Sequence, residues 1–466
     1  MKKLIYTLSI LAAVCSSSCK KFVDINVDPN NPLEVQEKLL LAPIEFNLVY
    51  NVEAGPEASA PSFTNHFMQM VAYNQPVPNF GTYQLVNTNL NSTWDAIYST
   101  CLQNLKILMN KSQANNNLNY KAIAEILTAQ TLGIATDLWG DIPYSQALGG
   151  VDNFTPAYDK QEDIYKSIQS LLDQALADIT ANTGAKPGSE DYFYAGDMAK
   201  WSKLAYTLKA RYYMHLTKAP GYTAGAQADL ALAALNNGLA ANADDMRFVY
   251  PGGSNSQNRW YTLMLPLSTL VASTAIVDTL VKRNDPRLPV LIAPVKGTTD
   301  SYVGRPIGAP AIGVLSSYSL IGSAYASVGS TQYLVPYTEA LFLKAEATLI
   351  KSGFAAAQPI FQSAITAHMT KLGITTTAIN TYLAARGTLT ATNALERIME
   401  EKKIADFLSV ENFNDWRRTG FPRLSPVPNA ISAIPRRMIY PQSEINTNPQ
   451  PQQSALLTDR VWWDAQ

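Results

Sequence analysis

Cysteine and histidine are both scarce in this chain of 466 residues, which has three of each. Three cysteines cannot build a disulfide framework, and the sequence has no HExxH motif, CxxC pair or histidine-rich tract to bind a metal. It also has no G-x-S-x-G, P-loop or G-x-G-x-x-G motif. We therefore expect no metal, no cofactor and no enzymatic activity. A secreted hydrolase with paired carboxylates stays open as an alternative, because nothing among the 37 acidic residues singles out a pair.

Charge is also low. Charged residues make up 16% of the chain, below the usual quarter or so, and the 36 basic residues nearly balance the 37 acidic ones. This balance gives no electrostatic basis for nucleic-acid binding, which depends on neutralising phosphates. The polar surface must instead come from amides, hydroxyls and the 24 tyrosines. Such a surface suits a neutral, hydroxyl-rich ligand.

Long hydrophobic runs are missing as well. The apolar run near the N-terminus, residues 4–14, has eleven residues, whereas a membrane-spanning helix needs about 20. Lys2 and Lys3 precede this run, and small residues lead from it to Cys19, which is the layout of a secretory signal peptide. We expect residues 1–18 to be removed and Cys19 to carry acyl chains such as palmitate, as in a bacterial lipoprotein anchored to a membrane. A plain secreted protein with a chance cysteine is the alternative.

After an Asp-, Asn- and Pro-rich tether at residues 19–33, helical periodicity covers much of the chain. Apolar residues recur at helical spacing over 93–110, 119–137, 164–179, 197–218, 226–241, 336–352, 355–372 and 392–409. Ser352 and Gly353 divide two of these segments into a helix–turn–helix unit of about 37 residues, and units near this length are typical of tetratricopeptide-like repeats. We therefore predict a mostly α-helical protein with paired helices as its scaffold.

Several single residues carry more local predictions. Asp159, three residues before Glu162, is expected to cap the helix that follows it. The charges of segment 392–409 are interpreted as a solvated helix face with pairs such as Arg397–Glu401. Cys101 lies in an apolar helical stretch and is expected to be a buried, inert thiol. The aromatic pair at 462–463 is expected to pack the C-terminal tail down.

Helical periodicity lapses in three segments, residues 54–92, 250–261 and 296–333, where small, polar and aromatic residues gather. Loops of this length in a compact protein are usually functional. Aromatic rings can cover the apolar faces of sugar rings while neighbouring amides bond their hydroxyls. The candidate ligand-binding residues are Trp260, Tyr261, Asn258, Tyr73, Tyr83 and Tyr318. For each of them, packing beneath its own loop is the alternative.

A series of short motifs runs in order from residue 19 to about 450. They are CKKF at 19–22, NVDPNNP at 26–32, DLWGDIPYS at 137–145, PAYD at 156–159, WSKL at 201–204, LKAR at 208–211, DPR at 285–287, YTEA at 337–340, KAEA at 344–347, NDWRRTG at 414–420 and RRMIYP at 436–441. Each motif is weak alone, but their order and coverage together resemble the SusD/RagB family of Bacteroidetes outer-membrane lipoproteins, in its SusD-like branch.

The resemblance implies one α-helical domain over residues 34–466, with a tetratricopeptide-like scaffold and long irregular loops on one side. It also implies a lipid-anchored protein, exposed at the surface of the bacterial outer membrane. Such a protein binds nutrient oligosaccharides and delivers them to a SusC-like TonB-dependent β-barrel transporter. RagB-like members bind peptides, so a peptide ligand is the alternative, and a purely structural role on the barrel is another. The motif residues Trp139, Trp201 and Trp416 are interpreted as scaffold.

Overall fold

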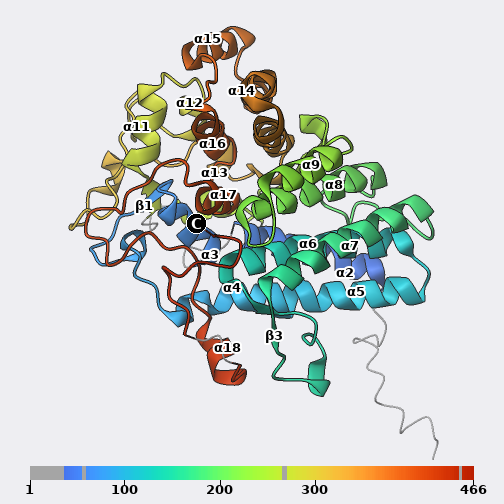
Figure 1. Cartoon of the computed structure of the whole chain (residues 1–466). Helices are drawn as coiled ribbons and strands as arrows, with labels where there is room; N and C mark the ends of the chain where they lie inside the picture. Colours follow the sequence, from blue (N-terminus) through green and yellow to red (C-terminus); the bar gives the residue numbers. More distant parts are fainter. Residues whose placement is uncertain (1–35, 55–58, 255, 265–269, 451–453, 466) are drawn as a thin grey trace, which may run out of the picture.

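The computed structural model describes residues 36–54, 59–254, 256–264, 270–450 and 454–465 (Figure 1). The expected signal peptide, the tether and the lipidation site Cys19 lie outside these residues, so the lipid anchor stays a prediction. Within the described residues, no helix is both long enough and apolar enough to cross a membrane.

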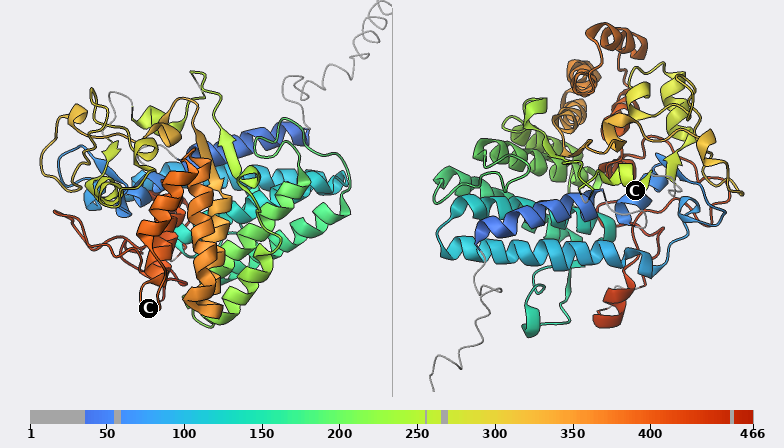
Figure 2. Two further views of the ribbon diagram at one scale, coloured as in Figure 1. Left: turned by 90° about the horizontal axis from the view of Figure 1, so that it is seen from above. Right: turned by 180° about the vertical axis from the view of Figure 1, so that it is seen from behind.

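The scaffold is a succession of helices in which each member packs against the next (Figures 1 and 2). Its members are α5 (Gln103–Ala114), α6 (Leu118–Trp139), α7 (Gln161–Ala181), α8 (Met198–His215), α9 (Ala224–Leu235), α14 (Tyr337–Lys371) and α16 (Ala394–Ala405). Helix α2 (Glu37–Asn47) lies alongside α5 at one edge, as the view from behind shows (Figure 2). Each scaffold helix from α5 onward overlaps a segment where the sequence predicts one, so the mostly α fold is confirmed.

Shorter helices connect and cover this scaffold. In the described chain they are α3 (Ala60–Phe67), α4 (Asn91–Asp95), α10 (Arg259–Leu263), α11 (Thr274–Lys282), α12 (Leu288–Leu291), α13 (Ser323–Ala326), α15 (Thr376–Arg386), α17 (Glu411–Thr419) and α18 (Gln442–Thr447). Two stretches, Leu48–Glu53 and Ala96–Leu102, are π-helical. Short 3₁₀ turns lie at Phe80–Thr82, Asn87–Leu90, Gly150–Asp152, Leu216–Lys218, Asn242–Asp244 and Leu315–Ser317.

Within the part of the chain that the structure describes, three antiparallel strand pairs link the irregular segments. They are β1 (Val71–Tyr73) with β5 (Leu270–Ala272), β2 (Ile142–Pro143) with β3 (Tyr158–Asp159), and β4 (Met246–Val249) with β6 (Thr331–Val335). In the first pair Val71 lies opposite Ala272 and Tyr73 opposite Leu270, which joins the predicted loop region 54–92 to the stretch between the other two. The irregular segments around this pair gather on the side of the molecule away from α5–α9 (Figure 1).

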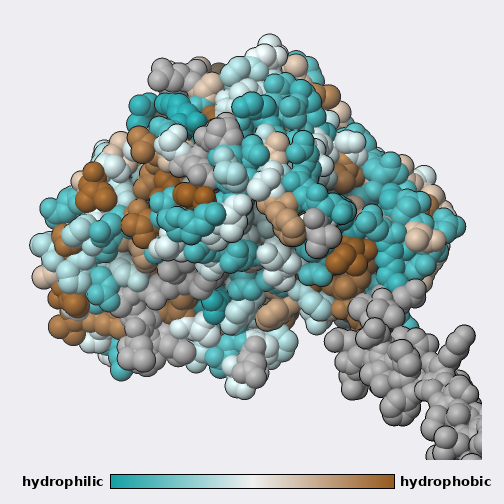
Figure 3. All heavy atoms as spheres, turned by 90° about the horizontal axis from the view of Figure 1, so that it is seen from below, coloured by the Kyte–Doolittle hydropathy of each residue, from teal (hydrophilic) through white to brown (hydrophobic). Residues whose placement is uncertain are grey.

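The core follows the helical spacing of the sequence. On α7 the side chains of Ile164, Ile168, Leu172 and Ala175 are buried, as one apolar stripe requires. A second, smaller group of buried residues lies between α14, α15 and α16, and Phe361 is one of its members. Outside the core, apolar residues on the face seen from below form separate small groups among hydrophilic ones (Figure 3).

The motif tryptophans belong to the scaffold. Trp139 and Trp201 are fully buried, and Trp416 is buried as well. The indole N–H of Trp139 donates to the carbonyl oxygen of Ile439 at 2.9 Å, which ties α6 to the C-terminal segment. The indole N–H of Trp201 donates to the carboxylate of Asp191 at 2.8 Å. Their interpretation as structural residues is confirmed.

Two further predictions of burial are confirmed. Cys101 is buried, and burial raises the pKa of its thiol to about 12, so little thiolate forms near neutral pH. At the C-terminus Trp463 is fully buried, and its indole N–H donates to Asp137 at 2.9 Å. The ring of Trp462 packs edge-on against Tyr222 at 5.7 Å between centroids. The tail is therefore packed down on the scaffold.

The expected cap of α7 is wrong. The carboxylate of Asp159 instead accepts hydrogen bonds from the backbone N–H groups of Tyr144 and Ser145, both at 2.8 Å. The backbone N–H of Gln161, the first residue of α7, donates to Asp141 at 2.9 Å. Asp141, which lies just after the end of α6, thus takes the capping role that local spacing assigned to Asp159.

The interpretation of α16 as a solvated charged face is also wrong. Glu401 and Lys402 are 0% and 1% exposed. Glu401 pairs with Arg287 at 2.7 Å and with Arg386 at 2.8 Å, rather than with a neighbour on its own helix. Lys402 pairs with Asp406 at 2.7 Å. Charges that look like surface charges in the sequence therefore form a buried network.

The break predicted at Ser352 and Gly353 is present inside α14. Gly353 has φ +80° and ψ 177°, whereas the residues on either side are helical. This region of backbone space is essentially restricted to glycine. Gly353 therefore lets two helical arms meet at an angle that a continuous helix could not adopt.

We expect Gly353→Ala to lower the free energy of unfolding by about 1–3 kcal/mol, because alanine strains this backbone conformation. No neighbouring atom lies within 4 Å of the added methyl group, so the cost is purely conformational. The matched control is Gly225→Ala in the first turn of α9, which also faces open space. It is expected to raise stability by about 0.5–1 kcal/mol. Urea unfolding followed by circular dichroism measures both, and effects of the same sign would contradict this account.

Candidate functional site

The structure divides the six candidate ligand-binding residues into a buried group and a partly exposed group. Trp260, Asn258 and Tyr83 are fully buried. The side chain of Asn258 caps α10 by accepting from the N–H of Tyr261 at 3.1 Å. The hydroxyl of Tyr83 accepts from the N–H of Val427 at 3.3 Å, and burial raises the pKa of this hydroxyl. The expectation that these three are exposed to a ligand is wrong, because each is fully buried.

Tyr73 lines a surface depression with a volume of about 280 Å³. Its ring lies edge-on to that of Phe80, with 5.4 Å between centroids. Within the described chain the side-chain amide of Gln84 has no hydrogen-bond partner, and Asn89 uses only its oxygen, which accepts from the N–H of Val86 at 2.9 Å. Both side chains line the same depression. An aromatic wall therefore lies beside amide groups that are available to a ligand.

Tyr318 lines a second and larger depression of about 560 Å³. Its lining is mostly apolar and consists of Met264, Ala293, Pro294, Lys296, Val314, Leu315, Ser316, Tyr318 and Leu320. Among these residues Val314 is 68% exposed. Apolar side chains that stay exposed around a hollow are a common feature of ligand-binding surfaces.

One buried arginine connects the two depressions. The Nε of Arg305 donates to the carbonyl oxygen of Tyr73 and its Nη1 to the hydroxyl of Tyr318, both at 3.2 Å. The guanidinium also lies 5.4 Å from the centre of the Tyr318 ring. Nearby, the side chain of Asn74 exchanges two hydrogen bonds with the backbone of Gly313, at 3.0 and 2.9 Å. We call these two linked depressions together the aromatic face, and its ring and amide residues are Tyr73, Phe80, Gln84, Asn89 and Tyr318.

Sequence reasoning missed part of this face. Phe80, Gln84 and Asn89 lie in the same aromatic and amide-rich segment as the chosen tyrosines, so their clustering over 79–89 was an available signal. Arg305 has no such signal, because an arginine in a glycine-rich loop ordinarily points to solvent. Tyr261 is half-buried on α10 and lines neither depression, so its role in binding stays a prediction.

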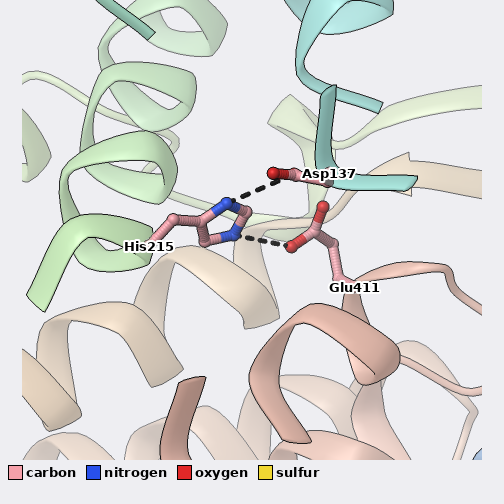
Figure 4. Close-up of side chains that lie close together, drawn as sticks. All are labelled: Asp137, His215 and Glu411. Atoms are coloured by element: carbon pink, nitrogen blue, oxygen red, sulfur yellow. Dashed lines mark hydrogen bonds and ion pairs between the residues drawn. The ribbon is translucent and has the colours of Figure 1, made fainter. Parts of the chain in front are cut away.

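A second cluster of chemically capable residues is buried inside the scaffold. His215 of α8 lies between the carboxylates of Asp137 on α6 and Glu411 on α17 (Figure 4). Its Nδ1 is 3.3 Å from Asp137 and its Nε2 is 3.1 Å from Glu411. Burial alone would lower the pKa of His215, but the two carboxylates outweigh it and raise the pKa to about 9.

These residue types are common metal ligands, and their atoms lie close together. Each ring nitrogen of His215, however, is taken up by a different carboxylate. This arrangement fits a protonated imidazole held by two ion pairs. We therefore assign the cluster a structural role, and the expected absence of a metal stays a prediction.

Comparison with known proteins places the chain in a family. Residues 29–441 match the profile of the family described as starch-binding and associating with the outer membrane. A search of curated proteins gave no match. A chitin-binding SusD homologue from Flavobacterium johnsoniae superposes with a TM-score of 0.80 at 24% identity, covering 92% of this chain and 98% of that one. A SusD/RagB family protein from Bacteroides thetaiotaomicron superposes with a TM-score of 0.79 at 26% identity, covering 92% and 99%. The family match spans most of the sequence, and this chain therefore belongs to the SusD-like family of binding proteins associated with the bacterial outer membrane.

Proposed function

We propose that this protein binds nutrient oligosaccharides at the cell surface and delivers them to a SusC-like TonB-dependent β-barrel transporter. The observation that carries the proposal is the aromatic face, where Tyr73 and Phe80 lie beside the amides of Gln84 and Asn89. Tyr318 adds a third ring in the neighbouring apolar depression. Flat rings cover the apolar faces of sugars, and amides bond the hydroxyls around them. The starch-binding description of the family and the chitin-binding homologue support a neutral glycan as the ligand class.

The proposed function also requires that the protein be held at the outer membrane. Cys19 carries the lipid that anchors the chain to the outer membrane, and residues 19–33 serve as the tether. The buried Arg305 links the two depressions of the aromatic face through its hydrogen bonds to Tyr73 and Tyr318. Binding without catalysis agrees with the lack of a recognisable catalytic motif in the sequence.

We expect Tyr73→Leu and Tyr318→Leu each to weaken oligosaccharide binding by about 5–30-fold, which corresponds to about 1–2 kcal/mol per ring. Leucine keeps apolar volume and removes the flat face on which a sugar stacks. Isothermal titration calorimetry with soluble starch and chitin oligosaccharides measures the affinity. Affinity electrophoresis extends the test to a wider glycan panel.

Tyr192→Leu is the matched control, because Tyr192 is 46% exposed and lines neither depression. Its affinity for oligosaccharides is expected to match that of the unaltered protein. If no glycan of the panel binds and peptides bind tightly, the glycan assignment is wrong and the ligand is a peptide. If neither Tyr73→Leu nor Tyr318→Leu weakens oligosaccharide binding, the ligand binds elsewhere than at the aromatic face.

A further inference from the structure

A polar cleft of about 310 Å³ lies on another part of the surface, between α11, α16 and the segment 422–424. Its charged lining residues are Arg283, Glu396, Glu400, Lys403 and Arg423. None of the residues that line it lines either depression of the aromatic face. Its volume is at the lower end of the range for small-molecule sites, which is about 300–1,000 Å³.

Most charges in this cleft have partners. Glu400 lies 3.0 Å from Arg283 and 2.8 Å from Arg386, so two arginines neutralise it. Glu396 lies 3.6 Å from the exposed Arg423. These contacts account for both acidic side chains of the lining.

Lys403 is the exception. No hydrogen bond or ion pair joins its Nζ to another residue in the described part of the chain. The side chain is half-buried on α16 and lines the cleft. Burial, assisted by the positive charge of Arg283, lowers the pKa of Lys403 to about 8. An ammonium group that is partly withdrawn from water without a counter-charge is unfavourable, and an anion in the cleft would supply that charge.

We propose that this cleft binds a small ligand with a single carboxylate, and that the Nζ of Lys403 pairs with that carboxylate. One unpaired positive charge matches the single negative charge of a carboxylate, whereas a doubly charged phosphate would leave one negative charge in the cleft without a partner. Ile276 and Ile404 supply apolar lining for the body of the ligand. Uronic-acid sugars and the C-termini of short peptides share this chemistry. The inference is independent of the proposed function, because the two sites have no lining residue in common.

The test is calorimetric titration of the purified protein with galacturonate, with its neutral counterpart galactose, and with N-acetylalanine. Galacturonate or N-acetylalanine is expected to bind at least tenfold more tightly than galactose, and the tighter of the two acids identifies the source of the carboxylate. Lys403→Met is expected to weaken acid binding at least tenfold, and Lys403→Arg to retain most of it. Affinity for the acid is also expected to fall as the pH rises through and above about 8, where the free amine loses its proton.

Lys344→Met serves as the control, because Lys344 is a half-buried lysine that lines a different depression and should not affect acid binding. Affinities for both acids no higher than that for galactose would overturn the proposal. So would no acid binding at about 10 mM, a concentration that detects even weak sites, or unchanged affinity in Lys403→Met. If that variant fails to fold, the arginine variant and the pH profile decide. Oligosaccharide binding at the aromatic face should be unaffected by Lys403→Met, so failure of one proposal is distinguishable from failure of the other.

Discussion

Replacing Arg287 by methionine is expected to lower the free energy of unfolding by about 3–5 kcal/mol. Arg287 is fully buried, and its Nη2 donates to Asp285 at 2.6 Å and to Glu401 at 2.7 Å. Glu401 keeps Arg386 as a partner at 2.8 Å, but Asp285 loses the guanidinium that compensates its charge. Burial would raise the pKa of Asp285, and Arg287 outweighs it so that the pKa lies below its usual range. Without the arginine, the folded protein must hold an uncompensated carboxylate or protonate it.

Urea unfolding at neutral pH measures this loss. Arg423→Met is the matched control, since Arg423 is 77% exposed and lies 3.6 Å from its acidic partner. Surface pairs of this kind contribute at most about 1 kcal/mol. Adding Asp285→Asn to Arg287→Met should recover part of the stability, because it removes the orphaned charge. A loss for Arg287→Met no larger than for Arg423→Met would show that the buried network contributes little.

The same network shows what the sequence could and could not predict. The helices were predictable because burying one face of a helix requires apolar residues at intervals of three or four positions. Such intervals can be recognised within a short stretch of sequence, as on α7. The burial of Glu401 was not, because its partner Arg287 lies 114 residues away in the sequence. Acidic and basic residues three or four positions apart look the same on a solvated helix and on one buried among arginines. Only contacts between distant segments distinguish the two.

The aromatic face was predictable in part for a related reason. Residue type and loop context selected Tyr73 and Tyr318 correctly as partly exposed rings, but the same criteria selected the buried Trp260. Composition does not state which side of a loop a ring faces. Contacts between distant segments also contribute, such as the hydrogen bond from Arg305 to the carbonyl oxygen of Tyr73, which spans 232 residues. The sequence therefore identifies the loops that carry candidate rings, but only the structure shows which of these rings are exposed.

His215 gives the scaffold a stability that depends on pH. Its ring nitrogens face Asp137 and Glu411, and the hydroxyl of Tyr165 lies 2.9 Å from Nδ1. Arg211 approaches Glu411 at 3.6 Å and does not displace the imidazole. Because these carboxylates belong to α6 and α17, a protonated His215 on α8 links three separate segments of the fold.

We expect this link to contribute roughly 3 kcal/mol to stability, since the pKa of His215 is raised from its ordinary 6.5 to about 9 and each unit corresponds to about 1.4 kcal/mol. A raised pKa favours folding while the histidine is protonated, so the contribution is complete below about pH 6.5 and is lost as the pH rises through 9. Lys403, with its lowered pKa, titrates in the opposite sense over part of this range. The measurement is therefore the difference in unfolding free energy between the unaltered protein and His215→Gln, in which Lys403 is the same. That difference should shrink from roughly 3 kcal/mol near pH 6.5 to a small value near pH 10. A difference that stays constant with pH would mean that the imidazole is neutral between its carboxylates and contributes only packing.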